Sequence, residues 1–319
     1  MMSMCKQLQP TVHIPPCGLN LEAFNSRRQK NKVVIVMGAT GTGKSRLSVD
    51  LATLFPAEII NSDKMQVYEG LDIVTNKITV EEQRGVPHHL LGMVKNPNAD
   101  FDAEDFCDEA SEAIDTITDR DRLPIIAGGS NSFIEHLVDG LDYSFRAKFE
   151  CLFLWVDVSM PVLHTYVSDR VDEMVRNGMV EEVRRMFDPD ASYNRGIRRA
   201  IGVPEFDRYF RDEMLYDERT RARVLQEAFN EIKDNTCKLA CRQLGKIHRL
   251  RSRDGWSLHR LDATEVYRRR GKGAEQTWKR HVAAPSAAIV EQFLRNFVPA
   301  VSRPTPTIRV PAMAAAASR

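Results

Sequence analysis

Apolar runs alternate with amphipathic segments over the first half of the chain. Four runs, at residues 33–37, 57–62, 123–127 and 151–158, have the length and composition of buried strands. Residues 103–119 place apolar side chains at helical spacing among acidic ones, which predicts an amphipathic helix between two of these strands. Strands and helices in alternation predict a parallel sheet with helices on both faces.

The second half of the chain follows a different pattern. Apolar positions at helical spacing predict three mainly helical segments, at residues 163–187, 196–210 and 219–250. An edge strand is predicted at residues 256–262 and a terminal helix at residues 283–297. We therefore expect an α/β fold, in which a doubly wound parallel sheet carries a helical subdomain over its crevice.

A glycine-rich turn follows the first predicted strand and opens a helix at residues 45–55. Its residues are Gly38, Ala39, Thr40, Gly41, Thr42, Gly43, Lys44 and Ser45, which have the spacing of the phosphate-binding P-loop. Backbone N–H groups of such a loop converge on a diphosphate at the helix N-terminus, and Lys44 adds a positive charge. Ser45 is the candidate ligand of a Mg²⁺ ion. The fold is therefore expected to be P-loop NTPase-like.

Two further strand ends are expected at the same crevice. Asp63 follows the second apolar run, and the carboxyl ends of neighbouring strands in a doubly wound sheet share one crevice. Asp63 is thus the best-placed carboxylate for proton transfer. The third run ends in a second glycine turn, Gly128 and Gly129, after which Ser130 and Asn131 could donate to a phosphate or a base.

Composition narrows the possible partners. Lys and Arg number 45 against 44 Asp and Glu, a formal net charge of +1, so no global field draws the chain onto nucleic acid or an anionic membrane. No apolar run reaches the length of a membrane span, and the six cysteines form no CxxC pair. We expect reduced thiols, no membrane, no stable nucleic-acid partner, and a monomer.

Two pairs of potential metal ligands are not expected to bind a metal, and the histidine pair is interpreted as structural or substrate-orienting. His88 and His89 lie in an extended segment, where neighbouring side chains point to opposite sides. Cys237 and Cys241 lie one helical turn apart without histidines at zinc-finger spacing, and we expect both thiols to pack against other helices.

The spacing of the residues leaves phosphoryl transfer open. Most P-loop sites act on the γ-phosphoryl group of a nucleotide. Asp157 ends the fourth apolar run and could hold Mg²⁺, while Asp63 could serve as the base of a small-molecule kinase.

Five blocks of sequence resemble the isopentenyltransferase family, which includes tRNA dimethylallyltransferases and plant adenylate isopentenyltransferases. The blocks are residues 38–45, 61–68, 87–90, 127–133 and 240–246. Residues 128–133 read Gly-Gly-Ser-Asn-Ser-Phe, where tRNA enzymes usually have Gly-Gly-Thr-Gly-Leu-Tyr. The chain therefore looks like the plant adenylate type, the enzymes that begin cytokinin biosynthesis.

The resemblance implies transfer of a dimethylallyl group from dimethylallyl diphosphate to N6 of the adenine in ATP or ADP, with AMP as a further acceptor. A tRNA dimethylallyltransferase is the alternative. The P-loop and Mg²⁺ then hold the donor diphosphate, Lys44 and Thr40 act on it, with Thr40 at its bridging oxygen, and Asp63 takes the N6 proton. Candidates for the nucleotide phosphates are the basic residues Arg199, Lys238 and Lys246.

We expect five parts along the chain. These are a flexible N-terminal arm (1–31), the P-loop core (32–160), the helical subdomain (161–250), a return strand with the terminal helix (251–298) and a disordered tail (299–319). The first 32 residues contain five Lys or Arg side chains and one acid, Glu22, which suits a transit peptide. A plastid location is therefore predicted, with the cytosol as the alternative.

Overall fold

Strand β1 (Asn31–Met37) is central because its last five residues, from Val33 to Met37, are fully buried on both faces. The computed structural model describes residues 30–140 and 144–295, and those from residue 31 on form one compact unit. Its six strands are all parallel, in the order β3-β2-β4-β1-β5-β6. The other strands are β2 (Ala57–Asn61), β3 (His88–His89), β4 (Leu123–Ala127), β5 (Phe149–Asp157) and β6 (Leu258–Asp262). The doubly wound sheet is confirmed.

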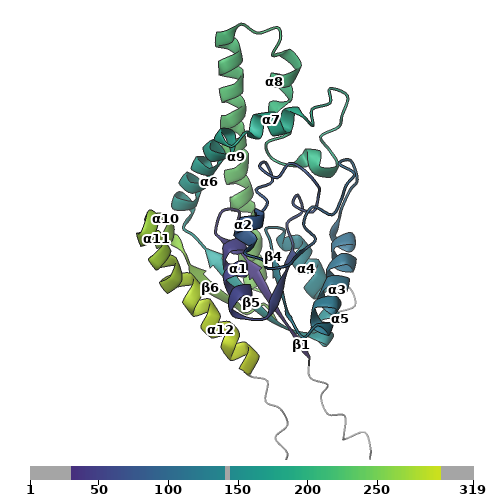
Figure 1. Ribbon diagram of the computed structural model, residues 1–319, viewed down its shortest axis with the longest axis vertical. Coiled ribbons are helices and arrows are strands. Elements are labelled where there is room, and N and C mark those ends of the chain that lie inside the picture. The colour runs from purple at the N-terminus through teal and green to yellow at the C-terminus, as the bar shows by residue number, and fades with distance from the viewer. Residues whose placement is uncertain (1–29, 141–143, 296–319) are drawn as a thin grey trace, which may run out of the picture. The chain divides into compact units, whose positions relative to one another are not determined.

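Helices cover both faces of the sheet (Figure 1). On one face, α1 (Lys44–Leu54) and α12 (Ala284–Arg295) pack against the even-numbered residues of β1. On the other face, α3 (Ala103–Asp119), α4 (Asn131–Asp139) and α9 (Glu218–Arg251) pack against the odd-numbered ones. Alternation along one strand thus produces two apolar cores.

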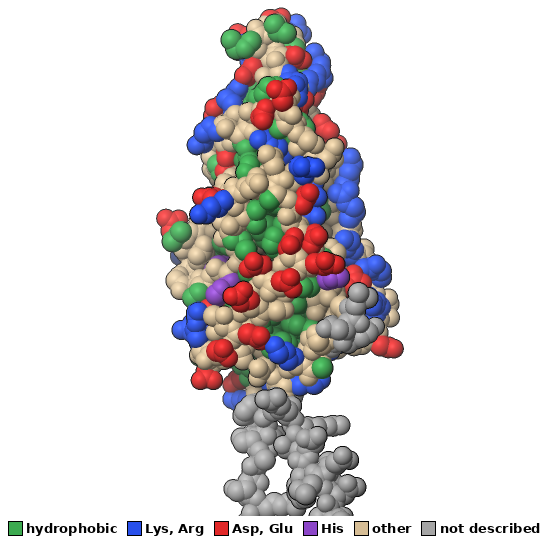
Figure 2. Space-filling view, turned by 90° about the vertical axis from the view of Figure 1, so that its right-hand side faces the viewer, with side chains coloured by type: hydrophobic (Ala, Val, Ile, Leu, Met, Phe, Trp, Pro, Cys, Tyr) green, Lys and Arg blue, Asp and Glu red, His purple; other side chains and the backbone are tan. Residues whose placement is uncertain are grey.

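Helix α3 is amphipathic, as its sequence predicts. Its buried side consists of Phe106, Ala110, Ala113, Ile114 and Ile117, whereas seven carboxylates and no Lys or Arg occupy the rest of its length. Acidic side chains gather across the middle of this face of the molecule (Figure 2). The solvent-facing side of α3 is therefore acidic.

The helical segments after β5 differ in detail from their predicted bounds. Instead of one helix at 163–187 there are two, α6 (Met160–Arg176) and α7 (Met179–Arg184), because Gly178 has a φ of 96° and breaks the helix between them. Instead of one helix at 196–210 there are two 3₁₀ turns and the short α8 (Asp207–Asp212). The other helices are α2 (Val80–Gln83), α5 (Ser144–Lys148), α10 (Thr264–Tyr267) and α11 (Gly271–Trp278).

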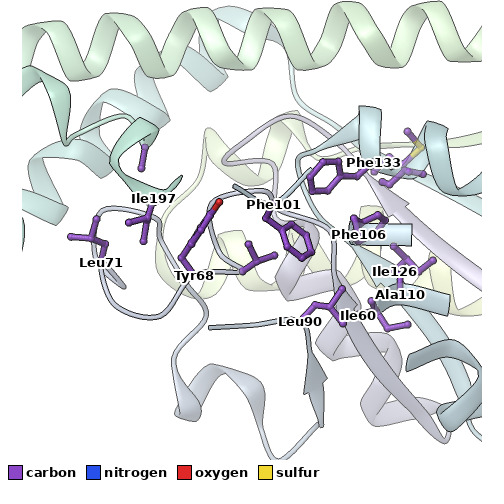
Figure 3. Close-up of a cluster of buried hydrophobic side chains, with 14 of the residues drawn as sticks. Ile60, Tyr68, Leu71, Leu90, Phe101, Phe106, Ala110, Ile126, Phe133 and Ile197 are labelled. Atoms are coloured by element: carbon purple, nitrogen blue, oxygen red, sulfur yellow. The ribbon is translucent and has the colours of Figure 1, made fainter. Parts of the chain in front are cut away.

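The helical segments share a core with the sheet. Figure 3 shows a cluster that has Ile60 and Ile126 of the sheet toward one end, Tyr68 and Phe101 in the middle, and Ile197 of the first 3₁₀ turn toward the other end. The predicted helical subdomain is therefore part of the one compact unit that the described residues form. The predicted flexible arm and disordered tail lie outside the described residues, apart from residues 30 and 31 of the arm.

Glu58 is a buried carboxylate near the amino-terminal end of β2, whereas the P-loop lies at the carboxyl ends of the strands. Its side chain is 2% exposed, and it contacts His89 at 2.6 Å and Arg120 at 3.2 Å. Burial acts to raise the pKa of Glu58, but the His89 hydrogen bond and the charges of Arg120 and Arg122 outweigh it and hold the pKa below its ordinary value. The carboxylate is thus ionised in the folded state.

We expect Glu58→Gln to lower the free energy of unfolding by about 2 kcal/mol at pH 7, because a charge-assisted hydrogen bond is lost. A carboxylate with a depressed pKa stabilises above its unfolded value and loses this contribution as the pH falls through its folded value. The difference from wild type should therefore shrink below the ordinary pKa of 4.5. Urea unfolding at pH 7 and pH 4 measures it.

The matched control is Glu150→Gln. Glu150 contacts Lys32 at 3.8 Å, but its side chain is 52% exposed, so a loss of less than about 0.5 kcal/mol is expected. Equal losses in the two variants would contradict a special role of the buried carboxylate.

Candidate active site

A cleft of about 1990 Å³ runs along the carboxyl ends of the strands. The turn after β1, the ends of β2 and β4, and the facing sides of α6 and α9 all contribute to its lining. The topology accounts for this, because parallel strands bring the turns that follow them to one edge of the sheet.

The P-loop closes on itself through the carbonyl oxygen of Ala39. This oxygen accepts hydrogen bonds from Thr42 Oγ1 at 2.9 Å and from Lys44 Nζ at 2.8 Å. Gly43 has a φ of 92°, and a Cβ there would lie 2.8 Å from the Trp278 ring. The loop therefore presents the first turn of α1, whose N–H groups have no intrahelical acceptor, to the cleft.

The ammonium group of Lys44 is buried and lies near a second cation, which is an unusual environment for it. Its pKa is lowered to about 8, mainly by burial; the charge of Asp63 opposes this shift, and the charge of Arg170 adds to it. A buried cation with another cation beside it is stabilised by a bound anion. The buried positive charge at the loop therefore favours binding of a phosphate group.

Arg170 of α6 is the second cation at the loop. Its Nη2 donates to Thr40 Oγ1 at 3.0 Å, while its Nε is buried and has no hydrogen-bond partner among the described residues. Burial lowers the pKa of Arg170, although the nearby Asp63 opposes this. A guanidinium with an unused donor at a P-loop suits the oxygens of a diphosphate.

Asp63 follows β2 and faces the same cleft. Its Oδ1 accepts the N–H of Met65 at 3.0 Å, whereas Oδ2 accepts no hydrogen bond from the described residues. Oδ2 lies 3.1 Å from where a Cβ on Gly129 would be, so the missing side chain at Gly129 makes room for the carboxylate. One carboxylate oxygen is therefore held in place and the other remains available as an acceptor.

The second glycine turn is tied to the end of β2 and to α9. Ser130 Oγ accepts the N–H of Lys64 at 2.9 Å, and Asn131 Nδ2 donates to the carbonyl oxygen of Gln243 at 3.2 Å. Asn131 is only 1% exposed. Both side chains hold the turn together, and because the Ser130 hydroxyl is an acceptor in its contact, its O–H remains able to donate. Direct contacts of Ser130 and Asn131 with a phosphate or a base stay a prediction.

Comparison with known proteins agrees with this geometry. The model of the IPP transferase family matches residues 66–148 and 141–249. Adenylate isopentenyltransferase 5, chloroplastic, of Arabidopsis thaliana is 62% identical over 269 residues, which cover 84% of this chain and 81% of that protein. The chain belongs to the adenylate isopentenyltransferase family. Adenylate isopentenyltransferase of Humulus lupulus is 47% identical and covers 81% of this chain and 89% of its own.

Solved structures of the wider family share the fold. A eukaryotic dimethylallyltransferase acting on tRNA has a TM-score of 0.70 and 24% identity, covering 88% of this chain and 82% of its own. The tRNA isopentenylpyrophosphate transferase of Bacillus halodurans has a TM-score of 0.64 and 25% identity, covering 84% of this chain and 100% of its own. The family resemblance seen in the sequence and the P-loop NTPase-like fold are both confirmed.

Most of the predicted site residues meet at the cleft. Those that line it are Thr40, Gly41, Gly43, Lys44, Ser45, Asp63, Ser130, Asn131, Arg199 and Lys246. The other P-loop residues, Gly38, Ala39 and Thr42, are buried and do not line the cleft. Lys238 is the exception, because it lies in a separate surface hollow with His164 and Cys241, and its Nζ lies 3.4 Å from Asn235 Oδ1. The structure therefore does not bring Lys238 together with the other residues that are predicted to contact the nucleotide phosphates.

Asp157 also differs from its predicted role. It does not line the cleft, and Arg260 Nε of the neighbouring strand donates to its Oδ2 at 2.7 Å. A kinase-type magnesium site that uses Asp157 opposite Ser45 is therefore not formed, which weakens the phosphoryl-transfer interpretation.

The other potential metal ligands make separate contacts. His89 contacts Glu58, whereas His88 Nδ1 contacts the carbonyl oxygen of Val86 at 2.8 Å. Cys237 and Cys241 are free thiols, and Cys241 Sγ lies 3.5 Å from His164 Nε2. Within residues 30–140 and 144–295, three or more His, Cys, Asp or Glu side chains nowhere converge in a metal-binding group.

Sequence reasoning missed three residues of the cleft. Arg170 is one of many arginines on amphipathic helices, which are usually solvated, and nothing in the sequence separates it from them. Lys64 directly follows Asp63 within a family block, which is a signal that could have marked it. Gln243 lies in the last block, but its partners become visible only in three dimensions.

Proposed function

We propose that this protein transfers the dimethylallyl group of dimethylallyl diphosphate to N6 of the adenine in ADP or ATP and releases diphosphate. The observation that most strongly supports this proposal is that two cations at the P-loop, Lys44 and Arg170, line the same cleft as Asp63. The Oδ2 atom of Asp63 is available there to accept a hydrogen bond. Relatives that are named adenylate isopentenyltransferases support the same reaction. The reaction is the step that begins cytokinin formation.

The acceptor nitrogen needs a proton acceptor. The N6 lone pair is delocalised into the adenine ring, and the nitrogen becomes acidic only as its bond to C1 of the prenyl group forms. Asp63 Oδ2 can accept the N6–H and take this proton in the transition state. Because Oδ1 is held by the Met65 N–H, the free oxygen has a fixed direction.

The donor end must stabilise a leaving diphosphate. The C1–O bond breaks, and its electron pair goes to the bridging oxygen, where negative charge accumulates. Thr40 Oγ1 accepts its hydrogen bond from Arg170, so the Thr40 O–H remains able to donate to that oxygen. Lys44 and the N–H groups of α1 act on the outer phosphate oxygens.

The site fits a Mg²⁺ ion. The Ser45 side chain is exposed to the cleft and makes no hydrogen bond to a described residue. Mg²⁺ in phosphate sites keeps several waters and takes one or two protein ligands beside the phosphate oxygens, so a single hydroxyl here suffices. When bound, Mg²⁺ supplies positive charge to the leaving diphosphate.

The acceptor phosphates are proposed to bind at a second group of cations, Lys64, Arg199 and Lys246, all of which line the cleft. Burial lowers the pKa of Lys64, and the charges of Arg199 and Lys246 lower it further, against the opposing charges of Asp100 and Asp102. Like charges gathered at a cleft wall favour an anionic ligand. The adenine would then lie between these cations and the P-loop.

We expect Lys64→Met to raise KM for ADP by about tenfold and KM for AMP by about twofold, because a charge-assisted contact to the β-phosphate is lost. Steady-state kinetics with each acceptor at saturating donor measures both. Lys238→Met, in the separate hollow, is the control and should leave both KM values unchanged. Equal rises for ADP and AMP would contradict the placement.

A tRNA acceptor is the alternative, favoured only by the fold shared with tRNA enzymes. The acidic face of α3 repels a polyanion (Figure 2). The formal net charge of +1 gives no compensating global attraction. A free nucleotide is the better match, and a monomeric state stays a prediction.

Product mass tests the proposal directly. Purified protein is incubated with Mg²⁺ and dimethylallyl diphosphate, and ATP, ADP, AMP or unmodified tRNA is supplied in separate reactions. A five-carbon mass gain on ADP or ATP is expected. Gain on tRNA alone would move the function to the tRNA branch, and nucleotide hydrolysis without prenylation would return it to a kinase-like reaction.

Plastid location is part of the proposal. The Arabidopsis relatives 5 and 3 are named chloroplastic, and relative 7 is named mitochondrial. The basic bias that favours targeting lies within residues 1–32, almost all of them outside the described part of the chain. None of the helices in that described part has both the length and the apolar character needed to span a membrane.

A further inference from the structure

Gln243 of α9 uses both ends of its side-chain amide on the backbone of two different turns. Its Oε1 accepts the N–H of Thr40 at 2.7 Å, and its Nε2 donates to the carbonyl oxygen of Gly129 at 2.9 Å. The residue is 8% exposed. A buried amide with both groups satisfied is held in one orientation.

Of the two turns that Gln243 connects, one lies at the proposed donor side of the cleft and the other at the proposed acceptor side. Thr40 carries the hydroxyl at the donor side, where Arg170 contacts it. Gly129 lies against Asp63 Oδ2, the acceptor of the N6 proton. A Cβ on Gly129 would lie 2.5 Å from Gln243 Nε2, so this turn approaches α9 as closely as a glycine allows.

We propose that Gln243 is a positioning residue that sets the separation between the P-loop and Asp63, and so aligns the prenyl C1 atom with N6. The inference rests on the proposed prenyl transfer. Gln243 acts through Thr40 and Gly129, because its amide oxygen and nitrogen are already bonded to them. Its backbone oxygen adds a third link by accepting from Asn131 Nδ2.

This role predicts a separation of turnover from donor binding. The diphosphate is held by Lys44, Arg170 and the N–H groups of α1, and the contacts of Gln243 include none of these. A displacement of about 1 Å between two reacting groups lowers turnover by about 10²-fold without abolishing binding. Loss of Gln243 should therefore act on kcat far more than on affinity for diphosphate.

The test uses Gln243→Met, which keeps the length of the side chain and removes both hydrogen bonds. We expect kcat to fall about 50-fold or more, and the Kd for inorganic diphosphate, measured by calorimetry, to change by less than about threefold. Hydrogen exchange at the Thr40 amide should accelerate, because that N–H loses its acceptor. The Asn side chain in Gln243→Asn is too short to span both turns, so this variant should also lose kcat while keeping its affinity for diphosphate. It replaces Gln243→Met in the test if the Met variant does not fold.

Asn235→Ala is the matched control, since it removes another hydrogen bond of α9, the one from Asn235 Nδ2 to Glu205 Oε1 at 2.8 Å. It should leave kcat within about twofold of wild type. The inference is overturned if a folded Gln243 variant keeps kcat within about threefold, or if kcat and diphosphate affinity fall by the same factor. Failure of the wild-type protein to prenylate any nucleotide would instead refute the proposed function.

Discussion

The Asp63→Asn variant is expected to turn over about 10³-fold more slowly than wild type, within the range for loss of a positioned general base. The amide keeps the shape of the side chain and the contact with the Met65 N–H, but it cannot take the N6 proton. KM for dimethylallyl diphosphate should change by less than about threefold, because the donor is held at the P-loop. Single-turnover measurements with saturating donor and ADP report the chemical step.

Asp157→Asn is the matched control, because Asp157 is also an aspartate at the end of an apolar strand. It pairs with Arg260 and lies outside the cleft, so kcat should stay within about twofold of wild type even if the variant is less stable. Near-normal turnover by Asp63→Asn would remove Asp63 from the mechanism. A comparable loss in both variants would point to a shared structural effect.

These two aspartates show what the sequence determines and what it leaves open. Both follow an apolar run, and the sequence correctly places the run at a strand that ends at the crevice edge. The environment of each carboxylate depends on which strand lies next to its own. Asp157 lies beside β6, whose Arg260 reaches it, whereas Asp63 lies beside β4, whose glycine turn leaves room for a ligand.

The basic residues of α9 show a second limit. Lys238 and Lys246 are eight residues apart, so they lie about 80° apart around the helix. The sequence does not show which direction faces the cleft, since that depends on how α9 packs on α6 and α4. Lys246 lines the cleft and Lys238 does not.

The P-loop was the most predictable part of the site. Its residues are contiguous, and its conformation is determined by local bonds such as those to the Ala39 carbonyl oxygen. Arg170 and Gln243 belong to the same site but come from α6 and α9, distant in sequence. Their roles depend on tertiary packing, which a single sequence does not reveal.

Removing the loop cation should have the second large effect. We expect Lys44→Met to lower kcat/KM for dimethylallyl diphosphate by about 10³-fold, because the charge on the leaving diphosphate loses its nearest cation in both the ground state and the transition state. Unlike Asp63→Asn, this variant should also bind inorganic diphosphate more weakly. Lys238→Met, a lysine outside the cleft, should leave both quantities unchanged.

The pH dependence separates Lys44 from the other cations. Burial lowers the pKa of Lys44 to about 8, so in the free protein the ammonium is charged below that pH and loses its proton above it. Wild-type kcat/KM for the donor should therefore fall as the pH rises from 7.5 to about 9, since this ratio reports the free enzyme. The Lys44→Met profile should be flat over that interval. A wild-type profile that stays level would show that Lys44 keeps its proton over this interval. A Lys44→Met variant that keeps the same decline would show that another group titrates.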